Sequence, residues 1–115
     1  MESIFDKYGQ VQAWLKRDVI YSVRGEAKAF VRNGSVYSFR GEHFGTYKSG
    51  FLRDKNGNAV AFTKGATGGP ITPLTQVPPL PPVFSLTPLQ PIPSLPPLAP
   101  IPSLSWGVAW NEFIK

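Results

Sequence analysis

The sequence contains no cysteine, one histidine and one methionine among its 115 residues. Without cysteine there are no disulfides or thiolate metal sites, and one histidine falls short of the several ligands that a metal site needs. No stretch is long and apolar enough to span a bilayer. Residues 1–6 have neither a basic start nor an apolar run, so they do not look like a signal peptide. We therefore expect one domain in the bacterial cytoplasm, with no cofactor.

Proline is absent from residues 1–69, and charged side chains are absent from residues 70–111. The first region carries eleven Lys or Arg and six Asp or Glu, whereas all 13 prolines lie between Pro70 and Pro102. This shift predicts three parts. They are a four-hairpin β repeat domain (1–66), a glycine linker with a proline-rich segment (67–104), and a Trp-containing C-terminal helix that packs on the domain (105–115).

One glycine recurs every sixteen residues, at Gly9, Gly25, Gly41 and Gly57. A fixed period of this kind indicates copies of one small structural unit. Three further columns repeat with the glycines: aliphatic (Ile4, Ile20, Val36, Leu52), small (Ala13, Ala29, Gly45, Ala61) and basic (Lys16, Arg32, Lys48, Lys64). The repeat therefore predicts the architecture of the first region but names no reaction.

Each copy predicts a hairpin of two short strands. Asp or Ser stands three residues before each repeated glycine, which is typical of a type I turn that ends at a glycine with positive φ. Asn33-Gly34 and Ser49-Gly50 predict tight turns between copies. The predicted strands are 2–6, 10–16, 19–23, 26–32, 35–39, 42–48, 51–54 and 58–64.

Closure of these strands would remove exposed strand edges. We therefore predict an all-β fold of four 16-residue β-hairpin repeats with pseudo-four-fold symmetry, followed by a polyproline II segment and a short C-terminal helix. A flat open meander is the alternative. Two aromatic columns are expected to fill the space between hairpins: Phe5, Tyr21 and Tyr37, broken by Arg53, and Trp14, Phe30 and Phe62, broken by Thr46.

Residues 36–45 (VYSFRGEHFG) and 53–62 (RDKNGNAVAF) resemble the bacterial four-fold beta flower proteins. The proline-rich stretch and the Trp-containing end are also similar, so the resemblance covers nearly the whole chain. It implies four hairpins arranged like petals. It implies no activity, and no functional residue is carried over from it.

The proline-rich segment holds an aliphatic residue at every third position. Because polyproline II has three residues per turn, these side chains form one straight stripe: Leu74, Val77, Leu80, Val83, Leu86, Leu89, Ile92, Leu95, Leu98, Ile101 and Leu104. The stripe predicts packing against something apolar. The segment could wrap its own hairpins, bundle with other copies, or present PxxP motifs to a foreign domain.

Trp106, Trp110 and Phe113 have the spacing of one face of a short helix, which Ser105 could cap. This helix is interpreted as a lid over the hairpins. The alternative is that its tryptophans anchor a partner.

No residue is predicted to be catalytic or to bind a cofactor or metal. His43 is expected to be a packing or surface residue, and Asp6 and Asp54 are expected to cap turns rather than form a carboxylate site. The leading hypothesis is a non-enzymatic structural or interaction module that self-associates through the proline-rich segment.

Two other functions remain open. In the first, the basic column Lys16, Arg32, Lys48 and Lys64 forms a rim that binds nucleic acid or another polyanion, with Tyr21 and Tyr37 as stacking surfaces. The second is a carbohydrate-binding ring, which requires Tyr21 and Tyr37 to be exposed.

Overall fold

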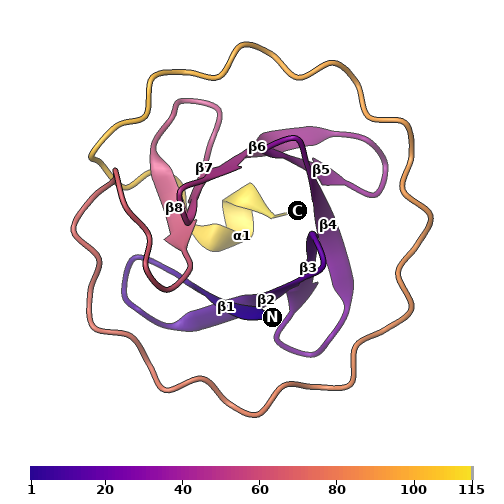
Figure 1. The fold of residues 1–115 in the computed structure, drawn as a ribbon, viewed down its shortest axis with the longest axis horizontal. Helices are drawn as coiled ribbons and strands as arrows, with labels where there is room; N and C mark the ends of the chain where they lie inside the picture. The colour runs from indigo at the N-terminus through magenta and orange to yellow at the C-terminus, as the bar shows by residue number, and fades with distance from the viewer. Residues whose placement is uncertain (115) are drawn as a thin grey trace.

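The structure is a computed structural model that describes residues 1–114. Eight strands form a closed antiparallel barrel in which each strand pairs with the next and β8 pairs with β1 (Figure 1). The strands are β1 (Glu2–Phe5), β2 (Val11–Lys16), β3 (Val19–Ser22), β4 (Ala27–Arg32), β5 (Ser35–Ser38), β6 (His43–Lys48), β7 (Phe51–Arg53) and β8 (Ala59–Phe62). The predicted closure is confirmed, and the flat meander is wrong.

The turn within each hairpin is built as the repeat predicts. In the first hairpin the Gly9 amide donates to the Asp6 carbonyl oxygen at 2.9 Å, with Gly9 at φ 80°. The Asp6 carboxylate accepts from the amides of Tyr8 and Gln10. A carboxylate that already accepts these turn amides is explained by capping, as expected for Asp6.

The turns between hairpins use residues with positive φ at both central positions. Asn33 and Gly34 have φ of 52° and 79°, whereas Arg17 and Asp18 have φ of 50° and 63°. Such turns match the right-handed twist of the flanking strands. The first of them holds two residues with a Cβ in a conformation that favours glycine or asparagine, which costs free energy.

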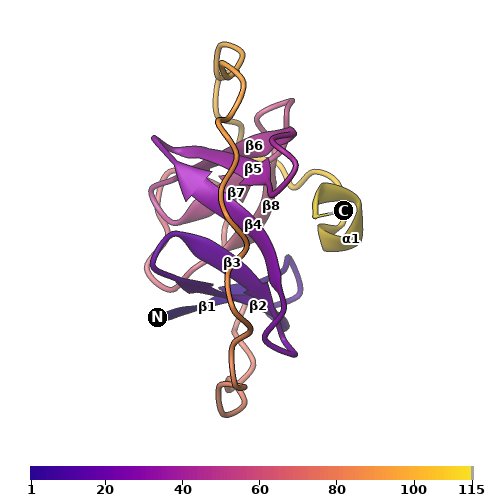
Figure 2. The same ribbon diagram turned by 90° about the vertical axis from the view of Figure 1, so that its right-hand side faces the viewer.

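The barrel interior is filled by the aliphatic column, whose four members are at most 1 % exposed. Helix α1 (Trp110–Phe113) lies over one end of the barrel (Figures 1 and 2), and both Trp110 and Phe113 join the interior cluster. A Cβ on Gly45 would lie 2.9 Å from the Phe113 ring and 1.9 Å from the Arg53 carbonyl oxygen. The small column thus makes room for the helix.

We call residues 70–104 the belt. They contain no helix or strand, and they run around the barrel as one wide loop that is seen edge-on in Figure 2. The molecule measures 37 × 35 × 21 Å, so the belt forms the perimeter of a thick disc. No helix within residues 1–114 is long and apolar enough to cross a membrane.

The C-terminal region differs from the prediction. The C-terminal helix is shorter than the predicted 105–115, because α1 has only four residues. Lys115 lies outside the described residues. Ser105 is not the helix cap, since Ala109 occupies that position without a side-chain bond. Instead, the Ser105 carbonyl accepts from the Ala59 amide and the Gly107 amide donates to the Ala59 carbonyl. These bonds hold the chain beside β8 before the helix begins.

Candidate functional site

The belt is attached to the barrel at intervals of nine residues. The repeated glycine of a hairpin offers its carbonyl oxygen to a belt amide at 2.8 to 3.1 Å in three of the hairpins: Gln76 to Gly9, Ser85 to Gly25, and Ser103 to Gly57. Side chains of the belt also bond to the hairpins: Gln76 accepts from the Val11 amide, and Ser85 accepts from the Ala27 amide. We call these attachment points nodes.

The node at the third hairpin is made differently. The nearest atoms to a Cβ built on Gly41 are at 3.7 Å or more, so the belt stands further off there. The Tyr37 hydroxyl donates to the Ser94 carbonyl at 3.2 Å. The nine-residue spacing was not predicted, although Ser85, Ser94 and Ser103 display it, because nine is a multiple of three and the spacing coincides with the period of the stripe.

The aliphatic stripe faces away from the barrel. Its eleven side chains are between 74 % and 97 % exposed. The belt wraps its own hairpins, which was one of the three alternatives. The stripe does not pack on these hairpins, so that part of the alternative is wrong. The reason is that amides, carbonyls and polar side chains of the belt make the nodes, which directs the stripe outward.

The aromatic columns cover the outer wall of the barrel. Tyr21 and Tyr37 are 6 % and 2 % exposed. The Phe84 ring of the belt lies 4.6 Å from the Tyr21 ring, and the Tyr21 hydroxyl is bonded to Thr87 at 3.0 Å. The prediction of Tyr21 and Tyr37 as stacking surfaces or sugar platforms is therefore wrong, because the belt and neighbouring strands bury them.

The basic column lies at the ends of the strands, on the wall that faces the belt. The Lys16 ammonium lies 4.8 Å from the centre of the Phe84 ring, and the Arg32 guanidinium donates to the Gln90 side chain. Lys48 lines a cavity under the belt, and Lys64 is exposed. The column is thus spread around the perimeter, and two of its members contact different parts of the belt.

Both predicted tryptophans have packing roles. Trp106 is half-buried with its ring 6.3 Å from Phe51 and 6.1 Å from Phe62, and Trp110 is 9 % exposed over the barrel end. These contacts agree with the interpretation of the C-terminal region as a lid.

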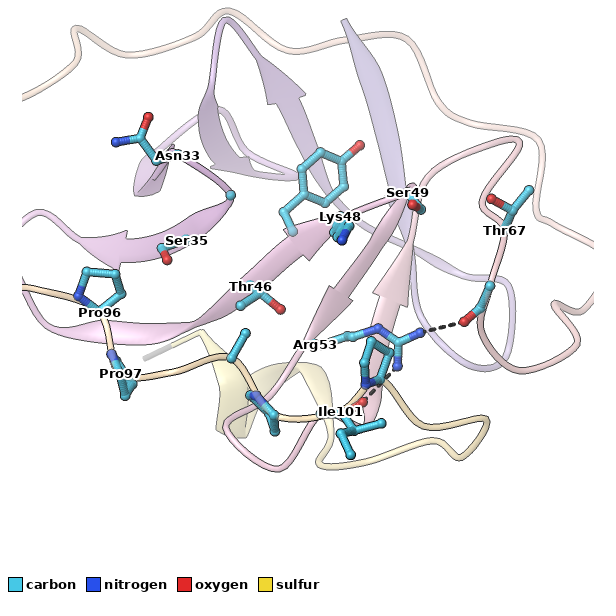
Figure 3. Close-up of a pocket in the computed structure, with 17 residues that line it drawn as sticks. Asn33, Ser35, Thr46, Lys48, Ser49, Arg53, Thr67, Pro96, Pro97 and Ile101 are labelled. Atoms are coloured by element: carbon cyan, nitrogen blue, oxygen red, sulfur yellow. Dashed lines mark hydrogen bonds between the residues drawn. The ribbon is translucent and has the colours of Figure 1, made fainter.

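A cavity of about 670 Å³ lies where both aromatic columns are broken (Figure 3). Three neighbouring strand pairs present two aromatic residues in register on the outer wall: Trp14 with Tyr21, Phe30 with Tyr37, and Phe62 with Phe5. The pair β6–β7 presents Thr46 with Arg53 instead. Belt residues 96, 97 and 99–102 form the opposite wall of the cavity.

Arg53 is 5 % exposed and is held by main-chain carbonyls from three segments. Its Nη1 donates to Gly57 at 2.7 Å and to Ser103 at 2.8 Å, and its Nη2 donates to Gly68 at 3.0 Å. Burial lowers the pKa of the guanidinium, and the Asp54 carboxylate opposes this effect. Arg53 therefore joins hairpin, belt and linker, and it brings a positive charge to the cavity wall.

His43 lies beside the same region, with its ring edge-on to Tyr37 at 5.4 Å. Both ring nitrogens are buried without a hydrogen-bond partner among residues 1–114. Burial, followed by repulsion from Lys55, lowers the pKa of His43 below 6.5. The ring is thus a neutral packing group, as the sequence analysis expected.

In the part of the chain that the structure describes, no group of three or more His, Cys, Asp or Glu could hold a metal ion. The fold defines a closed antiparallel barrel of eight short strands encircled by its own proline-rich segment. A family model described as 4-fold beta flower protein matches residues 2–114. The chain belongs to this family. No curated protein and no solved structure matches it.

Proposed function

We propose that this protein is a non-enzymatic structural module that self-associates edge to edge through the outward-facing stripe of its belt. The observation that carries the proposal is the exposure of the stripe, which is at least 74 % for each of its eleven side chains. Residues 70–111 also carry no charge, so nothing on the belt itself repels an apolar neighbour. Apolar patches of this extent on a soluble protein typically mark interaction sites.

We also infer that the belt is a polyproline II helix and that the molecule has pseudo-four-fold symmetry. Nine residues are three turns of polyproline II, so the same face of the belt returns to the barrel at each node. Each interval between nodes therefore displays three aliphatic side chains. The four nodes thus leave three similar intervals of belt around the disc, which supports four equivalent hairpins.

The spacing of the stripe suits packing between copies. Three residues of polyproline II rise about 9 Å, which leaves room between successive aliphatic side chains for one from a neighbouring belt. Two stripes could therefore interdigitate, and each fully buried Leu, Ile or Val would contribute about 1.5–3 kcal/mol.

The curvature of the disc limits each contact to a short arc. Each interval offers only three aliphatic side chains, so we infer that one edge buries less than the roughly 1,200 Å² of specific, stable interfaces. Several neighbours per copy are needed, because several weak contacts on one body act together. We therefore expect assemblies of several discs rather than an isolated dimer.

Multi-angle light scattering of the whole chain at micromolar concentrations tests the proposal. The variant exchanges three central stripe residues together: Leu80→Gln, Leu89→Gln and Leu98→Gln, each 93–97 % exposed in the native protein. The control is Val23→Gln, which alters a half-exposed apolar residue in a hairpin turn. The native protein and the control should form oligomers whose mass rises with concentration, and the triple variant should be monomeric. Its Tm should equal that of the native protein at dilutions where both are monomeric.

A native protein that stays monomeric, or a triple variant that associates as the native protein does, overturns self-association. Sedimentation with phosphatidylcholine vesicles adds a further arm. Binding of a monomeric native protein to vesicles, lost in the triple variant, would assign the stripe to a lipid surface and refute our proposal. Polyanion binding by the basic column stays a separate prediction, which titration with single-stranded nucleic acid at low salt would test.

A further inference from the structure

The outer wall of the barrel has one interval that its own side chains do not fill. Elsewhere an aromatic pair lies between the wall and the belt, and belt or hairpin residues add rings to it, as Phe84 does beside Tyr21 and Phe39 beside Phe30. At β6–β7 the paired residues are Thr46 and Arg53, and the cavity of about 670 Å³ takes the place of the rings. This volume is within the range of small-molecule binding sites, about 300–1,000 Å³.

The charged residues that line the cavity have one sign, whereas the Asp54 carboxylate, which acts on Arg53, is outside the lining. Among residues 1–114, Lys48 and Arg53 are the charged residues that line the cavity, and both are positive. All three acceptors bonded to the Arg53 guanidinium are neutral carbonyls. A guanidinium has five N–H donors, so two remain beyond the three bonds that hold it. A ligand with a carboxylate could accept from these donors and would offset the buried positive charge.

The remaining walls divide into an apolar side and a polar side. Prolines and small apolar residues of the belt form the first: Pro96, Pro97, Ala99, Pro100 and Ile101. Thr46 and Ser35 of the barrel contribute hydroxyl groups to the second. Figure 3 shows Thr46 and Arg53 on the side of the strands that faces this part of the belt. Proline surfaces pack well on aromatic rings, as in the recognition of polyproline segments.

We propose that this cavity binds a small aromatic carboxylate, with its ring under the belt where the other intervals hold aromatic side chains and its carboxylate toward Arg53 and Lys48. The ring would contact the belt prolines on one side and Thr46 on the other. This inference does not depend on self-association, since Ile101 is the one stripe residue among the described residues that line the cavity.

The test measures binding of 2-naphthoate to the whole chain by calorimetry and by the shift in Tm. The neutral analogue 2-naphthalenemethanol reports on the role of charge. We expect naphthoate to bind and raise Tm, and the neutral analogue to bind at least about tenfold more weakly, as loss of one charge-assisted hydrogen bond implies.

Two variants locate the site. Thr46→Phe restores the aromatic column and fills the cavity, so it should abolish naphthoate binding without lowering Tm. Its control is Thr72→Phe, which adds the same ring at an exposed position outside the cavity lining and should leave binding unchanged. Lys48→Gln removes an exposed charge at the cavity and should weaken naphthoate binding while barely affecting the neutral analogue.

Three results would overturn the proposal. They are an absence of naphthoate binding, binding that Thr46→Phe leaves intact, and equal binding of the acid and the alcohol. If Thr46→Phe fails to fold, Lys48→Gln decides, because it changes only an exposed side chain. Equal naphthoate affinity in Lys48→Gln and the native protein would then refute the site.

Discussion

The barrel and the belt are held in place in different ways. In the barrel, backbone ladders join all eight strands and the interior aliphatic side chains are almost wholly buried. The belt is bonded through a few groups every nine residues, and its aliphatic side chains lie in solvent. The same residue types therefore stabilise the fold in one region and form an interaction surface in the other.

The sharpest test of this difference uses one substitution in both regions. Leu52→Ala removes an interior side chain that is 1 % exposed and should lower the free energy of unfolding by about 2–5 kcal/mol, since it leaves a cavity. Leu86→Ala removes a side chain that is 96 % exposed and should change stability by less than about 0.5 kcal/mol. Urea unfolding of both variants under conditions that keep them monomeric measures the two values. Equal losses would show that the belt is packed as tightly as the barrel.

The nodes can be tested by comparing two repeated glycines. Gly25→Ala and Gly41→Ala both place a Cβ at positive φ, which costs about 1–3 kcal/mol. At Gly25 the Cβ would also lie 2.3 Å from the Val83 carbonyl oxygen, so the belt must move. Gly25→Ala should therefore be more destabilising and should speed hydrogen exchange at the Ser85 amide. Indistinguishable stabilities of the two variants would argue against belt contact at this node.

The first turn between hairpins offers a gain in stability confined to the barrel. Asp18 has φ of 63° where the equivalent residues of the next two such turns are Gly34 and Gly50. Asp18→Gly removes the cost of the left-handed conformation and should raise stability by about 1 kcal/mol. Thermal unfolding should show a higher Tm, whereas a lower Tm would mean that the Asp18 side chain makes a compensating contact.

The smallest expected effect is a pH dependence of stability caused by His43, which lies between the barrel and the belt. Because burial lowers its pKa in the folded state, the unfolded chain binds a proton more readily. Stability should be unaffected at neutral pH and should decrease as the pH falls through 6.5 toward the lowered pKa. His43→Ala, which matches Ala27 and Ala59 of the repeat, should lose this part of the pH dependence. Parallel stability profiles of the two proteins would contradict the assignment.

Most of the barrel was predictable because its information is local and is repeated four times. Asp6 and its equivalents specify turns through their own side chains, and the glycines tolerate the positive φ that those turns require. The broken columns were also visible in the sequence. The cavity was not predictable from them without the strand register that places Thr46 opposite Arg53. The two breaks form one cavity only because these residues are paired.

The belt and the C-terminal end were predicted less well because their placement depends on contacts distant in sequence. The stripe was expected to pack on something apolar, and the bonds of Gln76 and Ser85 to the hairpins turn it away from the barrel. Likewise, the spacing of Trp106 and Trp110 predicts one helix face, but pairing of Ser105 and Gly107 with Ala59 keeps the chain extended until α1.

The repeat lengths, sixteen residues in the barrel and nine in the belt, must stay in register for each node to form. A deletion of one residue from the belt would put every later node out of phase, and a deletion of three would keep the stripe in line but miss the next glycine. Only insertions or deletions of nine residues preserve both the line of the stripe and the positions of the nodes. A barrel with one more hairpin should thus require nine further residues of belt. The length of the belt therefore matches the number of hairpins that it encloses.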